Sequence, residues 1–284
     1  MGLIKIMKFA IKKSLNKTKS VKSINSPVGY FPTNYGFNIP NVNPNNIKIA
    51  ILDTGFPSHI DMSNIGLKSD LNCIDLLAYS SDAIDKNGHA TLVSGVLASS
   101  NPGSLIGMAP SATYYFCKII DDDGVGDTSN ITAGIIWALS HNVDIILLCA
   151  GSPIHDRYLE KMVKKAFEMG CIFIASSGRE VTGGSRTLYP AAFDGVVCCS
   201  SSRKNSCLFD KVRCRLDVSV DASSLWSTYS SDSYIKASGS SMAASVVCGC
   251  AINLIGDCMI KKIKLNGVKG FMTQMLERFK VKNV

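Results

Sequence analysis

The sequence lacks any apolar run of the roughly 18 residues that a membrane-spanning helix requires. It also lacks an export signal at its start. Such a signal needs an unbroken apolar core of about 7–15 residues, and lysines interrupt the apolar residues of positions 1–13. We therefore expect neither a membrane-spanning helix nor export.

Cysteines in a recognisable arrangement are missing as well. The 284 residues include 11 cysteines, an odd number, with no closely spaced disulfide framework and no pair of C-x-x-C units that would indicate zinc. Buried thiols in a reducing compartment suit this pattern best, so we expect a cytoplasmic protein. Six of the cysteines lie in apolar or strand-like surroundings, namely Cys149, Cys171, Cys198, Cys199, Cys248 and Cys250.

Acidic residues are absent from positions 1–22, which hold seven lysines. Positions 261–284 are basic too, with Glu277 as their single acid, so the net charge of +8 belongs to the two ends and the middle is net negative. A basic amphipathic start suits a membrane surface or nucleic acid, but a solvated tail explains it as well. We expect no nucleic-acid partner, and we favour the solvated tail over contact with a membrane surface.

What the sequence does contain is an alternation of apolar runs typical of buried strands with patterns typical of helices. This alternation predicts an α/β fold with a mostly parallel sheet and helices on both of its faces. The strands are expected at 47–52, 113–120, 143–149, 171–176 and 196–200, and the helices at 88–99, 130–141 and 156–169.

Two regions follow from this pattern. Residues 1–46 are interpreted as a basic N-terminal extension, because they are rich in lysine at first and then in Asn, Pro and Gly. Residues 47–284 are interpreted as one domain that ends in a basic helix at 268–279. We find no internal repeat and no interdomain linker.

Three polar residues occupy positions where such a fold concentrates its chemistry. Asp53 directly follows the first expected strand, His89 opens a helix in NGHATLVSG, and Ser241 opens another in GSSMAA. The carboxyl ends of parallel strands are where active sites form. A serine hydroxyl is a weak nucleophile near pH 7, so an imidazole must accept its proton and a carboxylate must orient the imidazole. Each residue also has a structural explanation as a turn former or a cap, but the three together predict an Asp-His-Ser triad.

The order of these motifs resembles the subtilisin-like (S8) serine peptidases over about residues 47–253. The layout is similar to that of intracellular members without a large prodomain. Further motifs agree, namely IGMAPSA at 106–112, DGVG at 123–126, GIIWA at 134–138 and YPA at 189–191. The last three are similar to family segments beside the substrate cleft and the specificity pocket.

The resemblance implies a three-layer subtilisin-like fold and a serine endopeptidase that hydrolyses protein or peptide substrates through an acyl-enzyme. It implies that Asp53 orients His89, that His89 acts as general base and then as general acid, and that Ser241 is the nucleophile.

The substrate-binding residues also come from the resemblance. It implies that Cys149, Ala150 and Gly151 form a strand edge on which a substrate adds as a further strand. It implies that Ser177 and Gly178 form one wall of the first specificity pocket.

Arg179 departs from the family pattern, which usually places there an Asn whose amide completes the oxyanion hole. Arginine carries five N–H donors, so Arg179 is a candidate replacement. The alternative is that Arg179 points to solvent or pairs with Glu180. The chain would then be a pseudoprotease that binds peptides or a partner with little or no cleavage. The retained triad favours a divergent processing protease, and an esterase ranks last because the G-x-S-x-G elbow is absent.

The resemblance bears on residues 1–46 and on one ion. No domain-sized prodomain precedes the first expected strand, so the extension is a candidate for a short propeptide or an arm that occupies the cleft. The chemistry itself requires no cofactor. Asp61, together with Asn101 in the loop 99–105, is a candidate ligand for a structural Ca²⁺, which prefers oxygen ligands. An ordinary turn explains the same two residues equally well.

Overall fold

The computed structural model describes residues 8–10, 46–65, 71–102, 104–178, 187–201 and 217–261. Most of the basic extension 1–46 and the helix expected at 268–279 lie outside these ranges.

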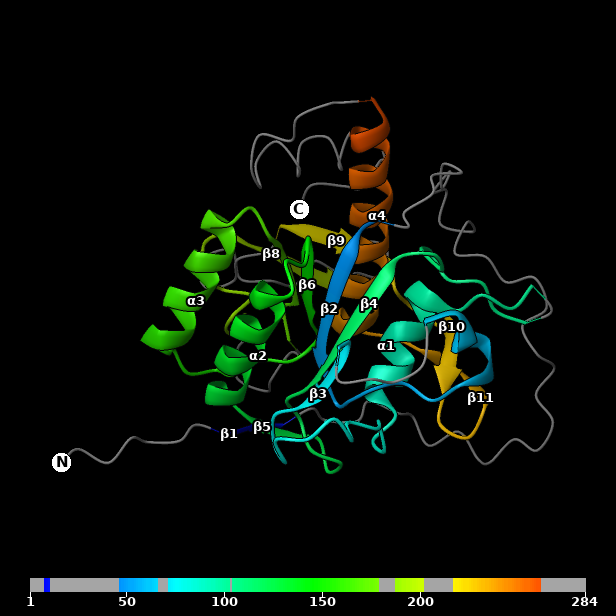
Figure 1. Ribbon diagram of the computed structural model, residues 1–284, viewed down its shortest axis with the longest axis horizontal. Coiled ribbons are helices and arrows are strands. Elements are labelled where there is room, and N and C mark those ends of the chain that lie inside the picture. The colour runs from blue at the N-terminus through cyan, green and yellow to red at the C-terminus, as the bar shows by residue number, and fades with distance from the viewer. Residues whose placement is uncertain are drawn as a thin grey trace.

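A seven-stranded sheet forms the centre of the protein, in the strand order β3-β4-β2-β6-β7-β8-β9 (Figure 1). Every neighbouring pair in it is parallel. The strands are nearly all buried on both faces, which is why their sequences read as continuous apolar runs. In chain order they are β2 (Lys48–Asp53), β3 (Cys73–Asp75), β4 (Thr113–Lys118), β6 (Ile145–Leu148), β7 (Ile172–Ser176), β8 (Val196–Ser201) and β9 (Val218–Val220).

Helices cover both faces of the sheet. Figure 1 shows α2 (Thr128–Ser140) and α3 (Arg157–Glu168) on one side of it and α1 (His89–Ala98) and α4 (Ser240–Lys261) on the other. The apolar side chains divide accordingly into two clusters, one on each face. The expected three-layer arrangement is therefore confirmed.

A hairpin of β10 (Leu225–Tyr229) and β11 (Ser233–Ala237) packs on α1, and the sequence did not predict it. Ser227 Oγ donates to Leu92 O and Thr228 Oγ1 to Thr91 O, both on α1. The contact is so close that a Cβ at Gly95 would collide with these two hydroxyl side chains. Polar side chains thus join the hairpin to the helix, which conceals the strands from a search for apolar alternation.

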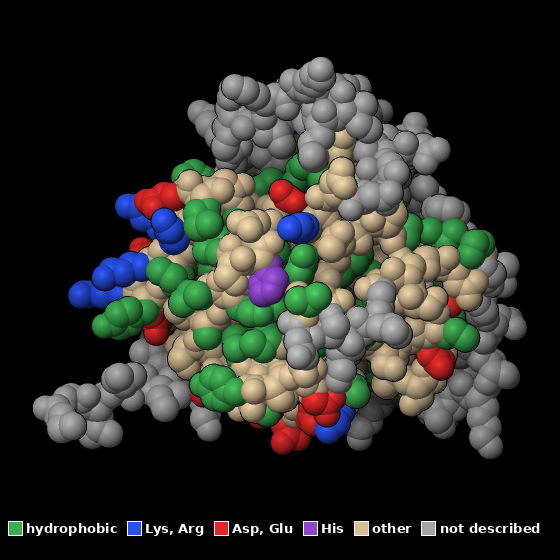
Figure 2. Space-filling view, viewed as in Figure 1, with side chains coloured by type: hydrophobic (Ala, Val, Ile, Leu, Met, Phe, Trp, Pro, Cys, Tyr) green, Lys and Arg blue, Asp and Glu red, His purple; other side chains and the backbone are tan. Residues whose placement is uncertain are grey.

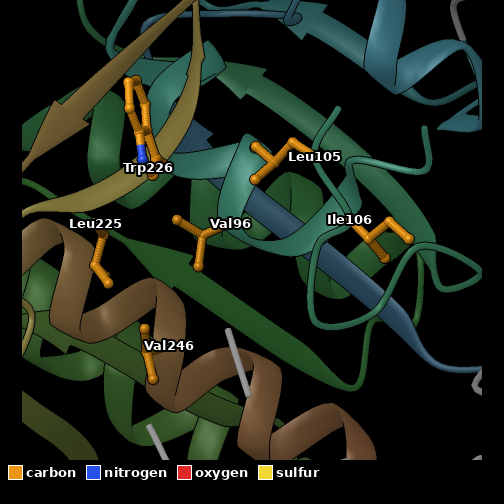
Figure 3. A pocket seen from close by; sticks show the side chains of 7 residues that line it. Val96, Leu105, Ile106, Leu225, Trp226 and Val246 are labelled. Atoms are coloured by element: carbon orange, nitrogen blue, oxygen red, sulfur yellow. The ribbon is translucent and has the colours of Figure 1, made fainter. Parts of the chain in front are cut away.

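A small apolar hollow lies between α1, β10, α4 and the segment 105–106 (Figure 3). Its wall includes Val96, Trp226 and Val246. Val246 is more than one helical turn beyond Ser241 along α4, since a turn takes about 3.6 residues. None of the residues that line this hollow is one of the predicted site residues.

Three short elements remain. The 3₁₀ segment η2 (Ile60–Ile65) precedes β3. Strand β5 (Val125–Asp127) directly precedes α2, and β1 (Lys8–Ala10) of the N-terminal extension pairs with it antiparallel. Within the described ranges no helix is both long and apolar enough to cross a bilayer.

Candidate active site

The three predicted catalytic residues come from three elements that meet at the carboxyl edge of the sheet. Asp53 is the last residue of β2, His89 is the first of α1, and Ser241 is the second of α4. Leu52 and Leu148 are partners in the β2–β6 register, so the next residues, Asp53 and Cys149, lie level at that edge.

Asp53 and His89 form a close pair. His89 Nδ1 lies 2.8 Å from Asp53 Oδ1 and 3.0 Å from Oδ2. The carboxylate is 1% exposed, and the Thr54 amide donates to its Oδ1 at 2.7 Å. An ionised carboxylate only accepts hydrogen bonds, so it assigns the proton to Nδ1 and leaves Nε2 of the ring as an acceptor. A proton acceptor with a fixed orientation is what a general base requires.

The electrostatic surroundings raise the pKa of His89 above its ordinary value of 6.5. Burial of the ring acts in the opposite direction, because it disfavours the charged form. The negative charge of Asp53, the hydrogen bond to it and the charge of Asp85 together outweigh this burial.

This pKa predicts the acid side of the pH–activity profile. His89 must be neutral to accept a proton, so kcat/KM on a peptide substrate is expected to fall with decreasing pH, with a midpoint above 6.5. The stability contribution has the opposite sign. The pair of Asp53 with protonated His89 contributes fully below pH 6.5, and this contribution is lost as the pH rises through the folded-state pKa.

The measurement is kcat/KM from about pH 5 to about pH 9, which brackets the ordinary pKa of histidine, on one uncharged peptide. His155→Gln is the control, because it removes a half-exposed histidine that pairs with Glu160, and it should leave the midpoint in place. A midpoint at or below 6.5 would contradict the raised pKa of His89.

Asp85 holds the start of α1 in place, and sequence reasoning missed it. Its Oδ1 accepts from the Gly88 amide and the Thr54 hydroxyl, each at 2.8 Å. Its Oδ2 accepts from the Thr91 amide and hydroxyl, each at 2.7 Å. These bonds satisfy helix N-terminal donors and fix where His89 begins the helix. The sequence signal that could have found Asp85 is local: an aspartate stands three residues before Gly88, the residue at which α1 is capped. In the structure Gly88 has φ +91°.

Ser241 contacts the end of β6. Its Oγ lies 3.4 Å from Cys149 O, and Cys149 Sγ lies 3.5 Å from Ser241 O, so each side chain donates to the other residue's carbonyl. In the described structure the hydroxyl of Ser241 is bonded to this carbonyl and not to His89. Catalytic hydrogen bonds often tighten only when substrate is bound.

The thiol of Cys149 contacts Ser241, but it is a poor nucleophile. Burial raises the pKa of the Cys149 thiol well above its ordinary value, and the charge of Asp53 raises it further. The thiolate is the reactive form of cysteine, so a buried thiol of this kind is inert. Across the described ranges eight cysteines are buried and no disulfide bond joins them.

The structure brings the predicted substrate-binding residues to the same edge. Ala150 and Gly151 continue directly from Cys149, and Gly151 has no room for a Cβ because the chain at Leu188 lies against it. Ser177 and Gly178 follow β7 in the same way.

Gly178 is hydrogen-bonded to the start of α4, the helix that carries Ser241. It has φ +91°, and its carbonyl accepts a hydrogen bond from Ser240 Oγ at 3.1 Å. Arg179 and Glu180, which come next, lie outside the described residues.

Asp61 and Asn101 are brought together, but as hydrogen-bond partners. Asp61 Oδ1 accepts from Asn101 Nδ2 at 2.8 Å. Asp61 Oδ2 accepts from Ser104 Oγ at 2.5 Å and from the Tyr234 hydroxyl at 2.7 Å. Ca²⁺ requires six to eight oxygen ligands, whereas here one carboxylate is surrounded by three N–H and O–H donors. No cluster of three His, Cys, Asp or Glu side chains suited to a metal occurs in the described ranges. The described structure therefore accounts for Asp61 and Asn101 by their hydrogen bonds, and the calcium ion stays a prediction.

Known proteins resemble the chain over this same region. The model of the subtilase family, peptidase S8, matches residues 44–258. Subtilisin DY of Bacillus licheniformis is 34% identical over 212 residues, which cover 72% of this chain and 75% of that protein. Subtilisin BL of Lederbergia lenta is 32% identical over 208 residues, which cover 72% of this chain and 74% of that protein. The minor extracellular protease Epr of Bacillus subtilis (strain 168) is 33% identical over 201 residues, covering 70% of this chain and 30% of Epr. The chain therefore belongs to the subtilase family of subtilisin-like serine peptidases.

Proposed function

We propose that this serine-type endopeptidase cleaves peptide bonds with Asp53, His89 and Ser241 through an acyl-enzyme on Ser241. The observation that carries the proposal is the 2.8 Å contact between His89 Nδ1 and the buried carboxylate of Asp53. It lies at the sheet edge where the first turn of α4 contacts Cys149. An Asp–His pair beside a serine is the arrangement that activates a hydroxyl.

The steps follow from the roles of these groups. Ser241 Oγ attacks the substrate carbonyl carbon while His89 Nε2 takes the hydroxyl proton. When the tetrahedral intermediate collapses, the C–N bond breaks, and the departing amine takes that proton from Nε2. Water then attacks the ester, again with His89 as base, and Ser241 regains its proton when the ester bond breaks. Asp53 stays ionised and stabilises each imidazolium.

A fluorophosphonate probe tests the assignment of the nucleophile. Covalent labelling of the full-length protein at Ser241, located by mass spectrometry, would support it. A native chain that stays unlabelled, while subtilisin in the same buffer reacts, would instead favour the pseudoprotease. That alternative has no support from the relatives, whose names describe subtilisins and proteases. The departure at Arg179 from the family pattern supports a divergent processing protease with few substrates.

Arg179 is proposed as the second oxyanion donor. Support comes from Gly178, because the bond from Ser240 Oγ to its carbonyl ties the chain that leads to Arg179 to the start of α4. Arg179→Ala is expected to lower kcat by about 10²–10³-fold with little change in KM, the loss that follows removal of the corresponding Asn donor in subtilisin.

The measurement is kcat and KM on one peptide, with Glu180→Ala as the neighbouring control, which should stay within a few-fold of the native protein. An unchanged rate in Arg179→Ala, or a roughly hundredfold faster Arg179→Asn, would show that Arg179 is not the donor.

Three further proposals complete this picture. The reaction needs no cofactor, because the proposed triad supplies the nucleophile, the base and the acid. The substrates are proteins or peptides, and nucleic acid is not a partner. A cytoplasmic location stays a prediction, supported by eight buried cysteines with no disulfide bond among them in the described ranges.

A further inference from the structure

The N-terminal extension supplies strand β1, which pairs with β5. In the pairing of β1 with β5, Lys8 lies opposite Asp127, Phe9 opposite Gly126 and Ala10 opposite Val125. Addition of an extended peptide to an exposed strand edge is a common mode of peptide recognition. The extension therefore shows how this chain holds one extended peptide, namely its own.

Strand β1 runs toward His89 and Asp53. Asn87, two residues before His89, donates from Nδ2 to Asp122 O at 2.9 Å. The turn that precedes β5 therefore lies beside the start of α1, and Asp127 lies at the opposite end of β5. Because β1 runs antiparallel to β5, the chain passes from Lys8, at the distant end, toward the end near His89. A peptide bound in this way places the residue opposite Asp127 on the N-terminal side of the bond that reaches the triad.

Asp127 has a carboxylate oxygen that nothing in the described structure satisfies. Its Oδ1 is buried and has no hydrogen-bond partner there. Asp127 stands at the N-cap of α2, yet its side chain makes no capping bond to that helix. The hydroxyl of the next residue, Thr128, does not donate to Asp127 in the described structure; it donates to Asp156 Oδ2. A buried acceptor without a partner costs free energy. A bound peptide whose side chain donates a hydrogen bond to Asp127 Oδ1 would remove this cost, so we expect such peptides to bind more tightly than peptides without a donor there.

The charges around β5 agree with a cationic ligand. Asp121, Asp122, Asp123 and Asp127 fall within seven residues, and Lys118 pairs with Asp122 at 2.6 Å. Acidic side chains gather at the lower rim of the face in Figure 2, the part of the view where Figure 1 places β5. The segment that pairs with β5 belongs to residues 1–22, which hold seven lysines and no acid. Opposite charges directly across an antiparallel pair are stabilising.

We propose that Asp127 is a specificity-determining residue. It selects extended peptides that carry a lysine or arginine on the N-terminal side of the cleaved bond, and Lys8 occupies that position in the chain's own extension. The proposal rests on the proposed peptidase function for its substrate preference, but not for the binding of the extension.

The first experiment measures substrate choice. The full-length protein cleaves a mixed peptide library, and mass spectrometry identifies the residues that flank each cut. At one position on the N-terminal side of the cut, the frequency of Lys and Arg is expected to exceed that of Glu and Asp at least about tenfold. Asp127→Asn should remove this enrichment, and Asp127→Lys should reverse it. Asp123→Asn, which removes an exposed carboxylate from the same loop, should leave it unchanged. An Asp127→Asn variant with the native preference would overturn the proposal.

The second experiment measures binding without catalysis. In the Ser241→Ala background, hydrogen exchange is followed in the peptide that covers residues 8–10. Lys8→Glu and Asp127→Lys should each speed exchange at least about threefold, and the charge-swapped double variant should return to within about twofold of its parent. Lys5→Glu makes the same change of charge in the extension at a position that is not in the register of β1 with β5, and it should have a smaller effect.

The exchange of α2 reports whether Asp127→Lys disturbs the fold, and the isosteric Asp127→Asn replaces it if so. Equal exchange in every variant, or a double variant that does not recover, would overturn the proposal. If the native protein cleaves nothing, the proposed function fails, and the exchange result still decides the role of Asp127.

Discussion

Ser241→Ala is expected to lower kcat for peptide hydrolysis by about 10⁴–10⁶-fold, the range found when the serine of such a triad is removed. Under the proposed mechanism the replacement deletes the oxygen that forms the acyl bond. Cys149 contacts Ser241, but it is a poor substitute nucleophile, because burial raises the pKa of its thiol and keeps it protonated. The variant should fold normally, because the hydroxyl of Ser241 makes a single long bond, to Cys149 O at 3.4 Å.

The measurement is the initial rate on a fluorogenic peptide, together with the thermal midpoint of unfolding. Ser238→Ala is the matched control. It removes the hydroxyl of an exposed serine three residues earlier, which accepts only the amide of Ser224, and it should retain the native rate within about twofold. A Ser241→Ala variant with more than about a tenth of the native rate would show that the hydrolysis depends on another group.

Asp53→Asn is expected to lower kcat by about 10⁴-fold, because an amide imposes the wrong tautomer on the imidazole. The oxygen of the introduced amide still accepts the hydrogen bond from the Thr54 backbone N–H, so the loop after β2 keeps its geometry. The NH₂ group of that amide then faces His89 Nδ1, which becomes the acceptor, and the ring proton moves to Nε2. A protonated Nε2 cannot take the proton of Ser241.

The loss of charge also changes the pH dependence. Asp53 is the largest contribution that raises the pKa of His89, so the acid-side midpoint should move down in Asp53→Asn while burial continues to depress it. The measurement is kcat across the same pH range, with Asp123→Asn as a control that removes a carboxylate from an exposed loop. A variant with a reduced rate but an unshifted midpoint would mean that Asp53 acts on the fold and not on the imidazole.

Local patterns in the sequence predicted the central part of this protein well. The apolar run before Asp53 and the small-residue helices at His89 and Ser241 are short-range signals, and the strands and helices lie where those signals occur. The site around these residues depends on neighbours distant in sequence. The contact of Ser241 with Cys149 spans 92 residues, and no local pattern encodes it.

The hairpin at 225–237 was missed for a physical reason. Its inward-facing Ser227 and Thr228 bind helix carbonyls, so polar side chains occupy buried positions. The calcium site at Asp61 stays a prediction, because the position of one carboxylate in the sequence says nothing about which groups surround it. A hydroxyl from Tyr234, 173 residues away in the sequence, occupies one side of that carboxylate.

The bonds of Asp61 have a consequence for the rate at which this protein unfolds. They join η2 to a loop 40 residues later and to β11, 173 residues from Asp61. Closing such long loops costs conformational entropy, which must be paid before the contacts stabilise the chain, so we expect these bonds to form late in folding. Interactions absent from the transition state slow unfolding without speeding folding. The hydrogen bonds of Asp61 would then lower the unfolding rate constant of the native protease and so prolong its lifetime, while leaving its folding rate nearly unchanged.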